Sequence, residues 1–343
     1  MKLKELIQNL TVLRVEGSTE VSIKGVSANS KSISPGHLFI ARRGKTFDGT
    51  LFLPEARISG AVAVVSDLYN PAAKDMTQVI VSNVKEAEAL LAKTFYRHPS
   101  SELMTVGVTG TNGKTTTTFY LKNLLEMMGI SCGLIGTVEN CIGGKVYHST
   151  HTTPDVVSNY RFLREMINEG CLAAVMEVTS HALDQGRVAH LDFNAAIFTN
   201  LSQDHLDYHR TMQEYAAAKS ELFTSLTPAA SAIVNSDCVY SKEMVRHCTA
   251  SIFSYGIVNE ADLSAQILQT DAQGSEVLFK WQGEKVAAFL PVVGKYNLYN
   301  AMGAMLVPLA KGSLLSEIAP LLESLPQVPG RLERVENKAG FSV

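Results

Sequence analysis

A glycine-rich segment from Gly107 to Thr116, GVTGTNGKTT, carries the residue types that bind phosphate. Small residues let backbone N–H groups approach phosphate oxygens, and a helix that begins at the loop adds partial positive charge. Lys114 is placed to reach the terminal phosphates, and the hydroxyl of Thr115 to ligate magnesium. The strict pattern G-x-x-x-x-G-K-[ST] is missed by one position, because Val108 stands five residues before Gly113. A glycine-rich turn with an incidental lysine is the alternative, but the combination favours an ATP or GTP site.

Acidic and imidazole side chains stand at the ends of two later apolar runs. Glu177 lies in VMEVTSHALDQGRV, and Asp204, His205, Asp207 and His209 lie in FTNLSQDHLDYH. If both runs are strands of one parallel sheet, Glu177 and His205 converge at its carboxyl edge and can hold a second magnesium ion. Each residue alone is more typical of a solvated loop, and Asp207 and His209 are alternatively caps of the next helix. Only the nearby phosphate loop favours a metal site.

Lys219 occupies an unusual position in the helix that the pattern predicts over residues 212–226. Apolar residues recur there at i, i+3, i+4 and i+7, and Lys219 falls on the same stripe. One interpretation is a lysine whose stem covers apolar surface while its charge stays in water. The other is a buried amine of lowered pKa, which in its neutral form adds carbon dioxide to become a carbamate. That carbamate carries negative charge and binds magnesium.

The elements around these residues predict an α/β protein. From Leu103 onward, LMTVGVTG, GKTTTTFYLKNLLEMMG and CGLIGTV read as strand, helix and strand. Further apolar runs at 172–178, 195–198 and 230–234 alternate with helical patterns, which predicts a mostly parallel sheet flanked by helices. Short apolar runs at 37–41 and 61–65 predict a smaller α/β unit over the first 100 or so residues, and the polar stretch YRHPSSE at 96–102 marks its boundary.

Composition excludes several classes of protein. The 343 residues are 46% hydrophobic and 18% charged, which is typical of a folded globular protein and not of a disordered one. The net charge of -3 gives no field that favours nucleic acid or an anionic membrane. Five cysteines without a C-x-x-C pair disfavour a disulfide framework and a structural zinc. The sequence contains no run of 18 apolar residues, so it predicts no membrane span. We therefore expect a cytoplasmic protein, by default a monomer.

Seven motifs resemble, in order and spacing, those of the Mur ligase family: GVTGTNGKTTTT, HTTPD, MEVTSHALDQGRV, FTNLSQDHLDYH, EYAAAKSELF, GKYNLYNAMGA and PGRLERV. SANSKSISPGHLFIARRGKTFDG further resembles the uridine-binding domain of the branch that adds the third amino acid of the peptidoglycan stem. The resemblance covers essentially the whole chain. It implies an ATP- and Mg²⁺-dependent ligase in which a carboxylate of a UDP-N-acetylmuramoyl-dipeptide is activated as an acyl phosphate and then attacked by an amino acid, diaminopimelate or lysine.

The same resemblance implies roles for individual residues. Lys114, Lys219 and His205 are implied to be catalytic, and the magnesium ligands to be Thr115, Glu177, His205 and carbamylated Lys219. The implied ATP contacts are Gly110, Thr111, Asn112, Gly113, Lys114, Thr115, Thr116, Asn200, Asn297, Asn300 and Arg331. The implied contacts to the UDP-muramoyl-peptide are Thr152, Thr153, Thr179, Ser180, Gln185 and Arg187, with Ser30, Lys45, Thr46 and Phe47 at the uridine end.

The resemblance also predicts the domain organisation. We expect residues 1–100 to form the uridine-binding domain, 101–330 the central ATP-binding domain, and 331–343 the start of a Rossmann-like third domain, the rest of which we expect the chain to lack. In the family that third domain selects the acceptor, so the sequence does not say which amino acid is added.

Two alternatives remain. One is a related amide ligase of the folylpolyglutamate synthetase type, which the uridine-type segment disfavours. The other is a nucleotide-binding module without catalysis, which the presence of Lys114, Glu177, His205 and Lys219 disfavours.

Overall fold

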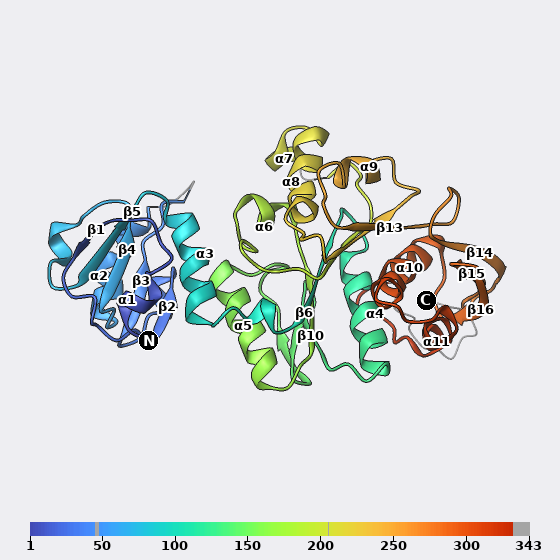
Figure 1. Ribbon diagram of the computed structural model, residues 1–343, viewed down its shortest axis with the longest axis horizontal. Coiled ribbons are helices and arrows are strands. Elements are labelled where there is room, and N and C mark those ends of the chain that lie inside the picture. The colour runs from blue at the N-terminus through green and yellow to red at the C-terminus, as the bar shows by residue number, and fades with distance from the viewer. Residues whose placement is uncertain (45–47, 205, 332–343) are drawn as a thin grey trace, which may run out of the picture. The chain divides into compact units, whose positions relative to one another are not determined.

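The computed structural model describes residues 1–44, 48–204 and 206–331, so the predicted site residues Lys45, Thr46, Phe47 and His205 lie outside the described residues. Contacts divide the chain into two compact units (Figure 1). The first unit comprises 1–99, 154–164 and 185–191, and the second comprises 100–153, 165–184 and the residues from 192 onward. The sequence predicted that each domain is one continuous stretch of chain, whereas residues 154–164 and 185–191 group by their contacts with the first unit.

The first unit is built on a five-stranded sheet in the order β1-β5-β4-β3-β2. Its strands are β1 (Val12–Glu16), β2 (Gly25–Ser27), β3 (His37–Ile40), β4 (Ala63–Ser66) and β5 (Thr77–Val81). β1 is antiparallel to β5, and the other pairs are parallel. Its helices are α1 (Leu3–Leu6), α2 (Leu53–Ile58) and α3 (Val84–Phe95). The apolar runs predicted at 37–41 and 61–65 are the buried strands β3 and β4, which confirms the predicted α/β unit.

The second unit contains an eleven-stranded sheet in the order β16-β15-β14-β13-β12-β11-β6-β10-β7-β8-β9. The strands from β14 to β7 in this order are parallel, and antiparallel strands continue the sheet at both ends. The parallel strands are β6 (Met104–Thr109), β7 (Cys132–Ile135), β10 (Ala173–Glu177), β11 (Ala195–Phe198), β12 (Ser231–Asn235), β13 (Ser251–Gly256) and β14 (Leu263–Thr270). The antiparallel strands are β8 (Glu139–Ile142), β9 (Lys145–His148), β15 (Ser275–Trp281) and β16 (Glu284–Leu290).

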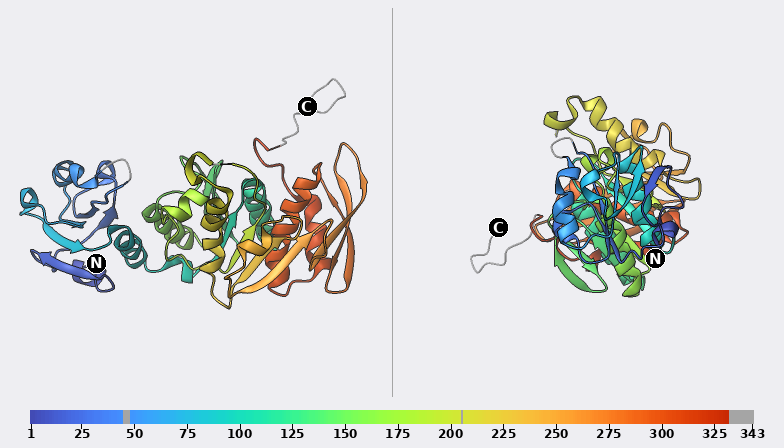
Figure 2. Two further views of the ribbon diagram at one scale, coloured as in Figure 1. Left: turned by 90° about the horizontal axis from the view of Figure 1, so that it is seen from above. Right: turned by 90° about the vertical axis from the view of Figure 1, so that its left-hand side faces the viewer.

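Helices cover both faces of the parallel strands, as two views show (Figures 1 and 2). The helices of the second unit are α4 (Lys114–Met127), α6 (Ser180–Asp184), α7 (Leu206–His209), α8 (Met212–Thr224), α9 (Ser241–Met244), α10 (Lys295–Ala310) and α11 (Leu315–Ile318). The helix α5 (Val156–Asn168) is divided, because its residues up to 164 group with the first unit. Val106 and Val108 of β6 share one buried cluster with α4 and α10. The opposite face of β6, at Gly107, meets Leu222 of α8. The fully buried central strands explain why their sequences are continuous apolar runs, and the predicted fold class is confirmed.

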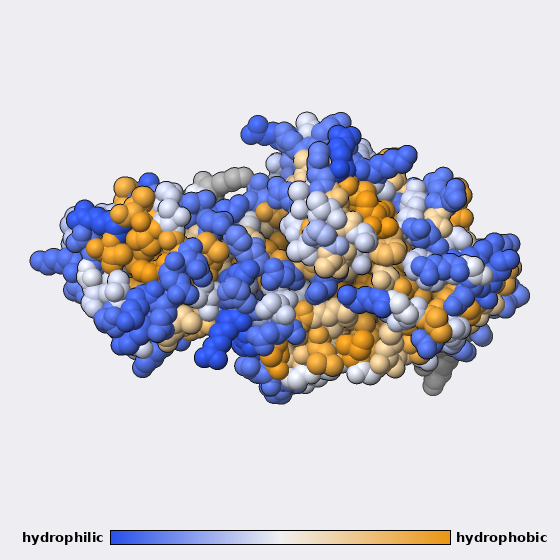
Figure 3. Space-filling view, viewed as in Figure 1, coloured by the Kyte–Doolittle hydropathy of each residue, from blue (hydrophilic) through white to orange (hydrophobic). Residues whose placement is uncertain are grey.

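Two further features of the described residues concern the cysteines and the helix lengths. Each of the five cysteines is a free thiol. None of the described helices combines the length and the apolar character that a bilayer crossing requires. On the face drawn in Figure 3, hydrophilic residues alternate with smaller apolar areas.

Candidate active site

The phosphate-binding loop connects β6 to α4 and runs from Gly110 to Gly113. Gly110 and Gly113 have φ of +147° and +87°, where only glycine is unstrained. A Cβ on Gly110 would lie 2.0 Å from Thr199 Oγ1, and one on Gly113 would lie 2.3 Å from Asn300 Oδ1. Neighbouring elements therefore press directly against the loop backbone, and glycine is required at both positions. Lys114 is the first residue of α4, so the N-terminal end of that helix faces the loop.

Two lysines from different helices donate to one carbonyl of this loop. Lys114 Nζ lies 2.9 Å from the carbonyl oxygen of Gly110 and 2.9 Å from that of Thr111. Lys219 Nζ, from α8, lies 3.0 Å from the same Gly110 oxygen. Two lysine amines thus meet at the point where β6 ends. The positive charge of Lys114 is suited to a polyphosphate.

Burial decides the protonation behaviour of Lys219. Its side chain is only 1% exposed, so it does not reach solvent as a snorkelling lysine would. Burial lowers its pKa well below the usual value, and the charge of Lys114 lowers it further, while Asp204 opposes this. The Nζ also lies 4.6 Å from the centre of the Tyr215 ring. Burial lowers the pKa of Lys114 as well, against the opposing charges of Glu177 and Asp204.

Glu177, at the end of β10, is fully buried beside the loop. Its carboxylate accepts hydrogen bonds from Thr115 Oγ1 at 3.1 Å, from the Thr137 N–H at 2.7 Å and from Thr137 Oγ1 at 3.1 Å. Mg²⁺ prefers oxygen ligands and is usually held by one or two carboxylates together with phosphate oxygens and water. The adjoining oxygens of Thr115 and Glu177 fit that requirement. Over residues 1–44, 48–204 and 206–331, no three His, Cys, Asp or Glu side chains cluster as metal ligands.

The hydroxyl-bearing residues predicted to contact the donor substrate lie next to Glu177. Thr153 Oγ1 donates to the Glu177 carbonyl at 2.8 Å, and Thr152 Oγ1 lies 3.1 Å from Thr137 Oγ1. The Thr179 N–H donates to Thr153 Oγ1 at 3.2 Å. Ser180 Oγ lies 2.9 Å from His209 Nε2. The N-cap residue of α8 is Thr211, so neither Asp207 nor His209 caps that helix.

The predicted ATP residues around the loop have defined contacts. Asn200 pairs with the backbone of Asn112, accepting its N–H at 3.1 Å and donating to its carbonyl at 3.0 Å. Asn300 accepts from Thr117 Oγ1 at 3.3 Å, and Asn297 donates to the Val293 carbonyl at 3.0 Å. These amides hold the loop and α10 in place as well as lining the site.

Two cavities flank the loop. One of about 540 Å³ is lined by Lys114, Thr115, Glu177, Asn297 and Arg331 among others. The other, of about 690 Å³, has a lining formed by Asn112, Gly113, Thr199, Asn200, Leu201, Ser202, Asn235, Asp237, Cys238, Val239, Lys295, Tyr296, Tyr299 and Asn300. The two cavities share Asn112, Gly113 and Asn300, so they adjoin each other. The structure therefore brings the predicted loop residues to one edge of the sheet, together with Glu177, Thr152, Thr179 and Arg331.

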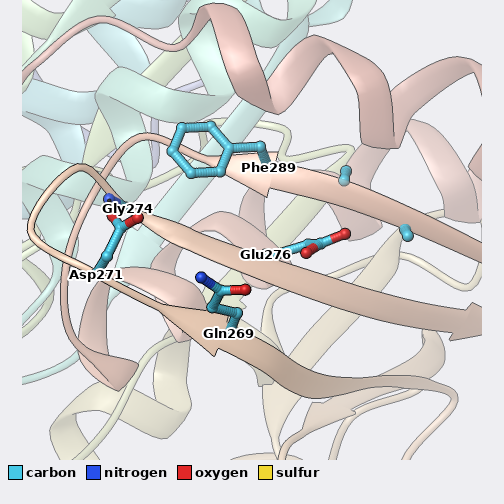
Figure 4. Close-up of a pocket in the computed structure, with 7 residues that line it drawn as sticks. Gln269, Asp271, Gly274, Glu276 and Phe289 are labelled. Atoms are coloured by element: carbon cyan, nitrogen blue, oxygen red, sulfur yellow. Dashed lines mark hydrogen bonds between the residues drawn. The ribbon is translucent and has the colours of Figure 1, made fainter.

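A third cavity lies away from the loop, where β14, β15 and β16 meet (Figure 4). It measures about 270 Å³, and the described residues that line it include Asp271 and Glu276 but no lysine or arginine. Asp271 is already used locally, because it accepts the N–H groups of Gln273 and Gly274 in the turn. An acidic lining repels a polyphosphate, so the loop cavities are the better nucleotide site.

The remaining predicted residues belong to the first unit. Ser30 is buried and its hydroxyl donates to Glu55 at 2.8 Å. Arg187 donates through two nitrogens to Gln185 Oε1, at 3.1 and 2.7 Å.

Sequence reasoning gave no site role to Thr137, Asp237 or Tyr299. Thr137 binds Glu177, and Tyr299 donates to Asp237 at 2.7 Å beside the larger cavity. Thr137 and Asp237 stand two residues after the ends of β7 and β12, so their position at strand carboxyl ends was a usable signal.

Comparison with known proteins agrees with this geometry. The fold and loop define a nucleotide-binding α/β enzyme class, and residues 108–308 match the Mur ligase middle domain while residues 22–96 match the Mur ligase family, catalytic domain. The chain belongs to the Mur ligase family, which confirms the predicted resemblance.

The similar proteins point in the same direction. The chain is 36% identical to the UDP-N-acetylmuramoyl-L-alanyl-D-glutamate--2,6-diaminopimelate ligase of Chlamydia pneumoniae, over 98% of this chain and 69% of that protein. It is 38% identical to the ligase of the same name from Caldanaerobacter subterraneus subsp. tengcongensis, over 100% of this chain and 70% of that protein.

Solved structures show the same fold. A UDP-N-acetylmuramoyl-L-alanyl-D-glutamate--2,6-diaminopimelate ligase superposes with a TM-score of 0.84 at 26% identity, covering 98% of this chain and 69% of that one. A folylpolyglutamate synthase of Mycobacterium tuberculosis, with TM-score 0.58 and 17% identity over 71% of this chain and 63% of that one, shares the fold alone.

Proposed function

We propose that this chain carries out the ATP-dependent joining of 2,6-diaminopimelate to UDP-N-acetylmuramoyl-L-alanyl-D-glutamate, the reaction named for its relatives. The observation that carries the proposal is the convergence of Lys114 and Lys219 on the Gly110 carbonyl, next to the Thr115–Glu177 pair. The ammonium of Lys114 and a buried carboxylate that can hold Mg²⁺ lie at one strand edge, and they supply what phosphoryl transfer between two anions needs. Lysine is the alternative acceptor.

The reaction divides into two displacements. A carboxylate oxygen of the donor attacks the γ-phosphorus of ATP, forming a C–O–P bond while the bond to ADP breaks. The amine of the incoming amino acid then attacks the acyl carbon, the acyl–phosphate bond breaks, and phosphate and one proton leave. Each displacement brings negative groups together, and two unit charges 4 Å apart repel by about 4 kcal/mol at an effective dielectric near 20.

The residues of this chain oppose that repulsion. We infer that the backbone from Gly110 to Gly113 and the ammonium of Lys114 bind the β- and γ-phosphates. Thr115 and Glu177 would hold magnesium, which when bound neutralises phosphate charge. The larger cavity beside Asn300 accommodates the nucleoside half of ATP.

Lys219 is proposed to act as a carbamate. Its amine, neutral because burial lowers its pKa, attacks carbon dioxide and loses a proton, so that the group changes from a potential cation to an anion. The N–H of the carbamate still donates to Gly110, and its oxygens become ligands for magnesium. The change also removes the repulsion between Lys219 and Lys114.

The remaining assignments follow the family. We propose that residues 1–100 bind the uridine end and 101–330 bind ATP. Thr152, Thr153, Thr179 and Ser180, with Gln185 and Arg187, are proposed to contact the muramoyl-peptide. We also propose that the protein is a cytoplasmic monomer.

A ligation assay tests the function. The protein is incubated with ATP, Mg²⁺, the UDP-muramoyl-dipeptide and diaminopimelate, and ADP and the UDP-tripeptide are measured. Lysine in place of diaminopimelate, and a folate with glutamate in place of both, are the comparison reactions. We expect ADP formation that depends on the UDP-dipeptide. Turnover with the folate alone would instead support the folylpolyglutamate synthetase type, and nucleotide binding without turnover in any reaction would support a non-catalytic module.

A further inference from the structure

Arg42 connects three parts of the first unit. It follows β3, and its guanidinium NH1 lies 3.2 Å from Glu88 Oε2 on α3. Its NH2 donates to the backbone carbonyl of Gln185 at 3.3 Å. The Glu88 side chain is 3% exposed and that of Arg42 is 32% exposed. An ion pair with a buried carboxylate and a partly exposed guanidinium therefore aims a charged donor at the segment that carries Gln185 and Arg187.

The two members of the ion pair depend on each other. Burial raises the pKa of the Glu88 carboxyl, and the charge and hydrogen bond of Arg42 oppose that rise. Asp155 adds a further negative charge nearby that acts in the same direction as burial. Arg42 is thus the counter-charge of Glu88, and Glu88 fixes the direction of the guanidinium.

The backbone of Arg42 is fixed as well. Its carbonyl accepts the Gly49 N–H at 2.9 Å, and a Cβ on Gly49 would lie only 2.4 Å from that carbonyl oxygen. Its own N–H donates to the Ile40 carbonyl at 3.1 Å. The guanidinium therefore extends from a rigid base at the end of β3.

The turn from Gln185 to Arg187 is held from several sides. Gly186 has φ +71°, and a Cβ there would lie 2.5 Å from Lys85 Cε. Asn159, which is fully buried, donates to the Arg187 carbonyl at 2.8 Å. The amide oxygen of Gln185 accepts both donors of Arg187. Arg42 completes this arrangement by holding the Gln185 carbonyl.

We propose that Arg42, oriented by Glu88, is a positioning residue for the donor substrate, because it fixes the Gln185–Arg187 turn in the conformation that binds the UDP-muramoyl-peptide. This inference rests on the proposed function. A turn already held in its binding conformation loses less conformational entropy when ligand binds. We expect the effect to be confined to the donor substrate, because the side-chain contacts of Arg42 are to Glu88 and Gln185 and not to the ATP-binding loop.

Calorimetry of the chain with UDP-N-acetylmuramoyl-L-alanyl-D-glutamate, and separately with ATP, tests the proposal. The double variant Arg42→Leu/Glu88→Leu removes the donor without leaving a buried charge, so it is expected to fold. We expect its Kd for the UDP ligand to rise about five- to tenfold, as for one lost hydrogen bond, and its Kd for ATP to stay within about twofold. In ligation assays KM for the UDP substrate should rise while kcat changes little.

Single variants keep the test decisive if the double variant does not fold. Arg42→Lys keeps the charge beside Glu88 but cannot make both contacts, so we expect a UDP-ligand Kd about two- to fivefold higher. Glu88→Gln keeps the volume and an acceptor but loses the charge that orients Arg42, and a similar rise is expected.

The matched control is Arg57→Leu/Asp75→Leu in the same unit. Arg57 Nε lies 2.9 Å from Asp75 Oδ2, and its NH1 donates to the Ala72 carbonyl at 3.3 Å. It thus makes the same pair of contacts as Arg42, but the pair is 49% and 53% exposed, and neither contact involves Gln185 or Arg187. We expect unchanged affinity for both ligands.

Each outcome has one meaning. Wild-type affinity of the Arg42 and Glu88 variants for the UDP ligand overturns the proposal, and so does an equal loss of ATP affinity. If the wild-type chain itself does not bind the UDP ligand, the proposed function fails and this inference fails with it. The two failures are therefore distinguishable.

Discussion

The phosphate loop and the Gln185–Arg187 turn both use cationic side chains, but they use them in opposite ways. In the first unit, Arg42 is paired with the buried carboxylate of Glu88. In the second unit, Lys114 and Lys219 share a carbonyl acceptor, and neither forms an ion pair with another described residue. Arg42, whose charge is neutralised within the protein, positions a backbone. Lys114 keeps its charge available to a ligand, whereas Lys219 is the neutral amine proposed to become a carbamate.

The difference has an energetic cost at the loop. Burying an amine without a counter-ion disfavours its charged form, which lowers the pKa of Lys219. A paired arginine avoids that cost but cannot bind a second anion as strongly. Substitutions in the two regions should therefore have different effects, of which the largest is expected at the loop.

Lys114→Ala removes the cation assigned to the phosphates and should lower ATP-dependent turnover by about 10³-fold or more, as expected when a main charge-stabilising group is lost. ADP release in the ligation assay measures this. Lys122→Ala on the same helix is the control, because Lys122 pairs with Glu126 instead of the loop. Unchanged turnover in Lys114→Ala would contradict the assignment of this loop to the phosphates of ATP.

Lys219→Ala should lower turnover by about 10²-fold, because the proposed carbamate ligand is lost. Short carboxylic acids added to the assay should restore part of the activity by replacing the carbamate. Full activity without any additive would show that no carbamate is needed.

Glu177→Gln keeps the size of the side chain but removes its charge. We expect the Mg²⁺ concentration for half-maximal activity to rise about tenfold or more, since a neutral amide is a poorer ligand than a carboxylate. A magnesium titration checks this, and Glu169→Gln, at an exposed ion pair with Lys145, is the control. A variant with the wild-type magnesium requirement would exclude Glu177 as a ligand.

Replacing Arg42 and Lys219, one at a time, by methionine should change the free energy of unfolding in opposite directions. Arg42→Met leaves Glu88 buried without its counter-charge and should lower the free energy of unfolding by about 2 kcal/mol, less than for a fully buried pair because Arg42 is partly exposed. Lys219→Met removes the cost of burying an amine and should raise it by about 1 kcal/mol in carbonate-free buffer. Denaturant unfolding measures both values.

The gain from Lys219→Met should also depend on pH. The folded pKa of Lys219 lies below its unfolded value, so between the two the unfolded chain binds more protons and wild-type stability rises with pH. The advantage of methionine is therefore largest below the folded pKa and shrinks as pH rises toward the unfolded value near 10.5. An advantage that grows with pH would contradict the buried amine.

Much of the second unit was predictable because its signals are local. The strand, glycine loop and helix around Lys114 form one continuous segment, and buried parallel strands produce apolar runs that are visible without a structure. Lys219 could be singled out because helical periodicity placed a charge on an apolar stripe. The antiparallel strands β8, β9, β15 and β16 were not predicted, since short alternating segments give a weaker signal than buried runs.

The site contacts were predictable only in part. The motif resemblance selected residues, but it did not show that Thr137 binds Glu177 or that Tyr299 binds Asp237, pairs separated by 40 and 62 positions in the sequence. The roles carried over from the family remain predictions until the variants are measured.

The sequence by itself determined the family, the α/β class and the identity of the phosphate loop, because those depend on residue types at short and regular spacing. Only the tertiary structure decided that Lys219 reaches the Gly110 carbonyl from a distant helix, and that Arg42 joins Glu88 to the Gln185 backbone. The physical reason is that burial and pairing depend on which segments fold against each other. The same lysine or arginine is a solvated charge or a perturbed one according to neighbours that lie far away in the sequence.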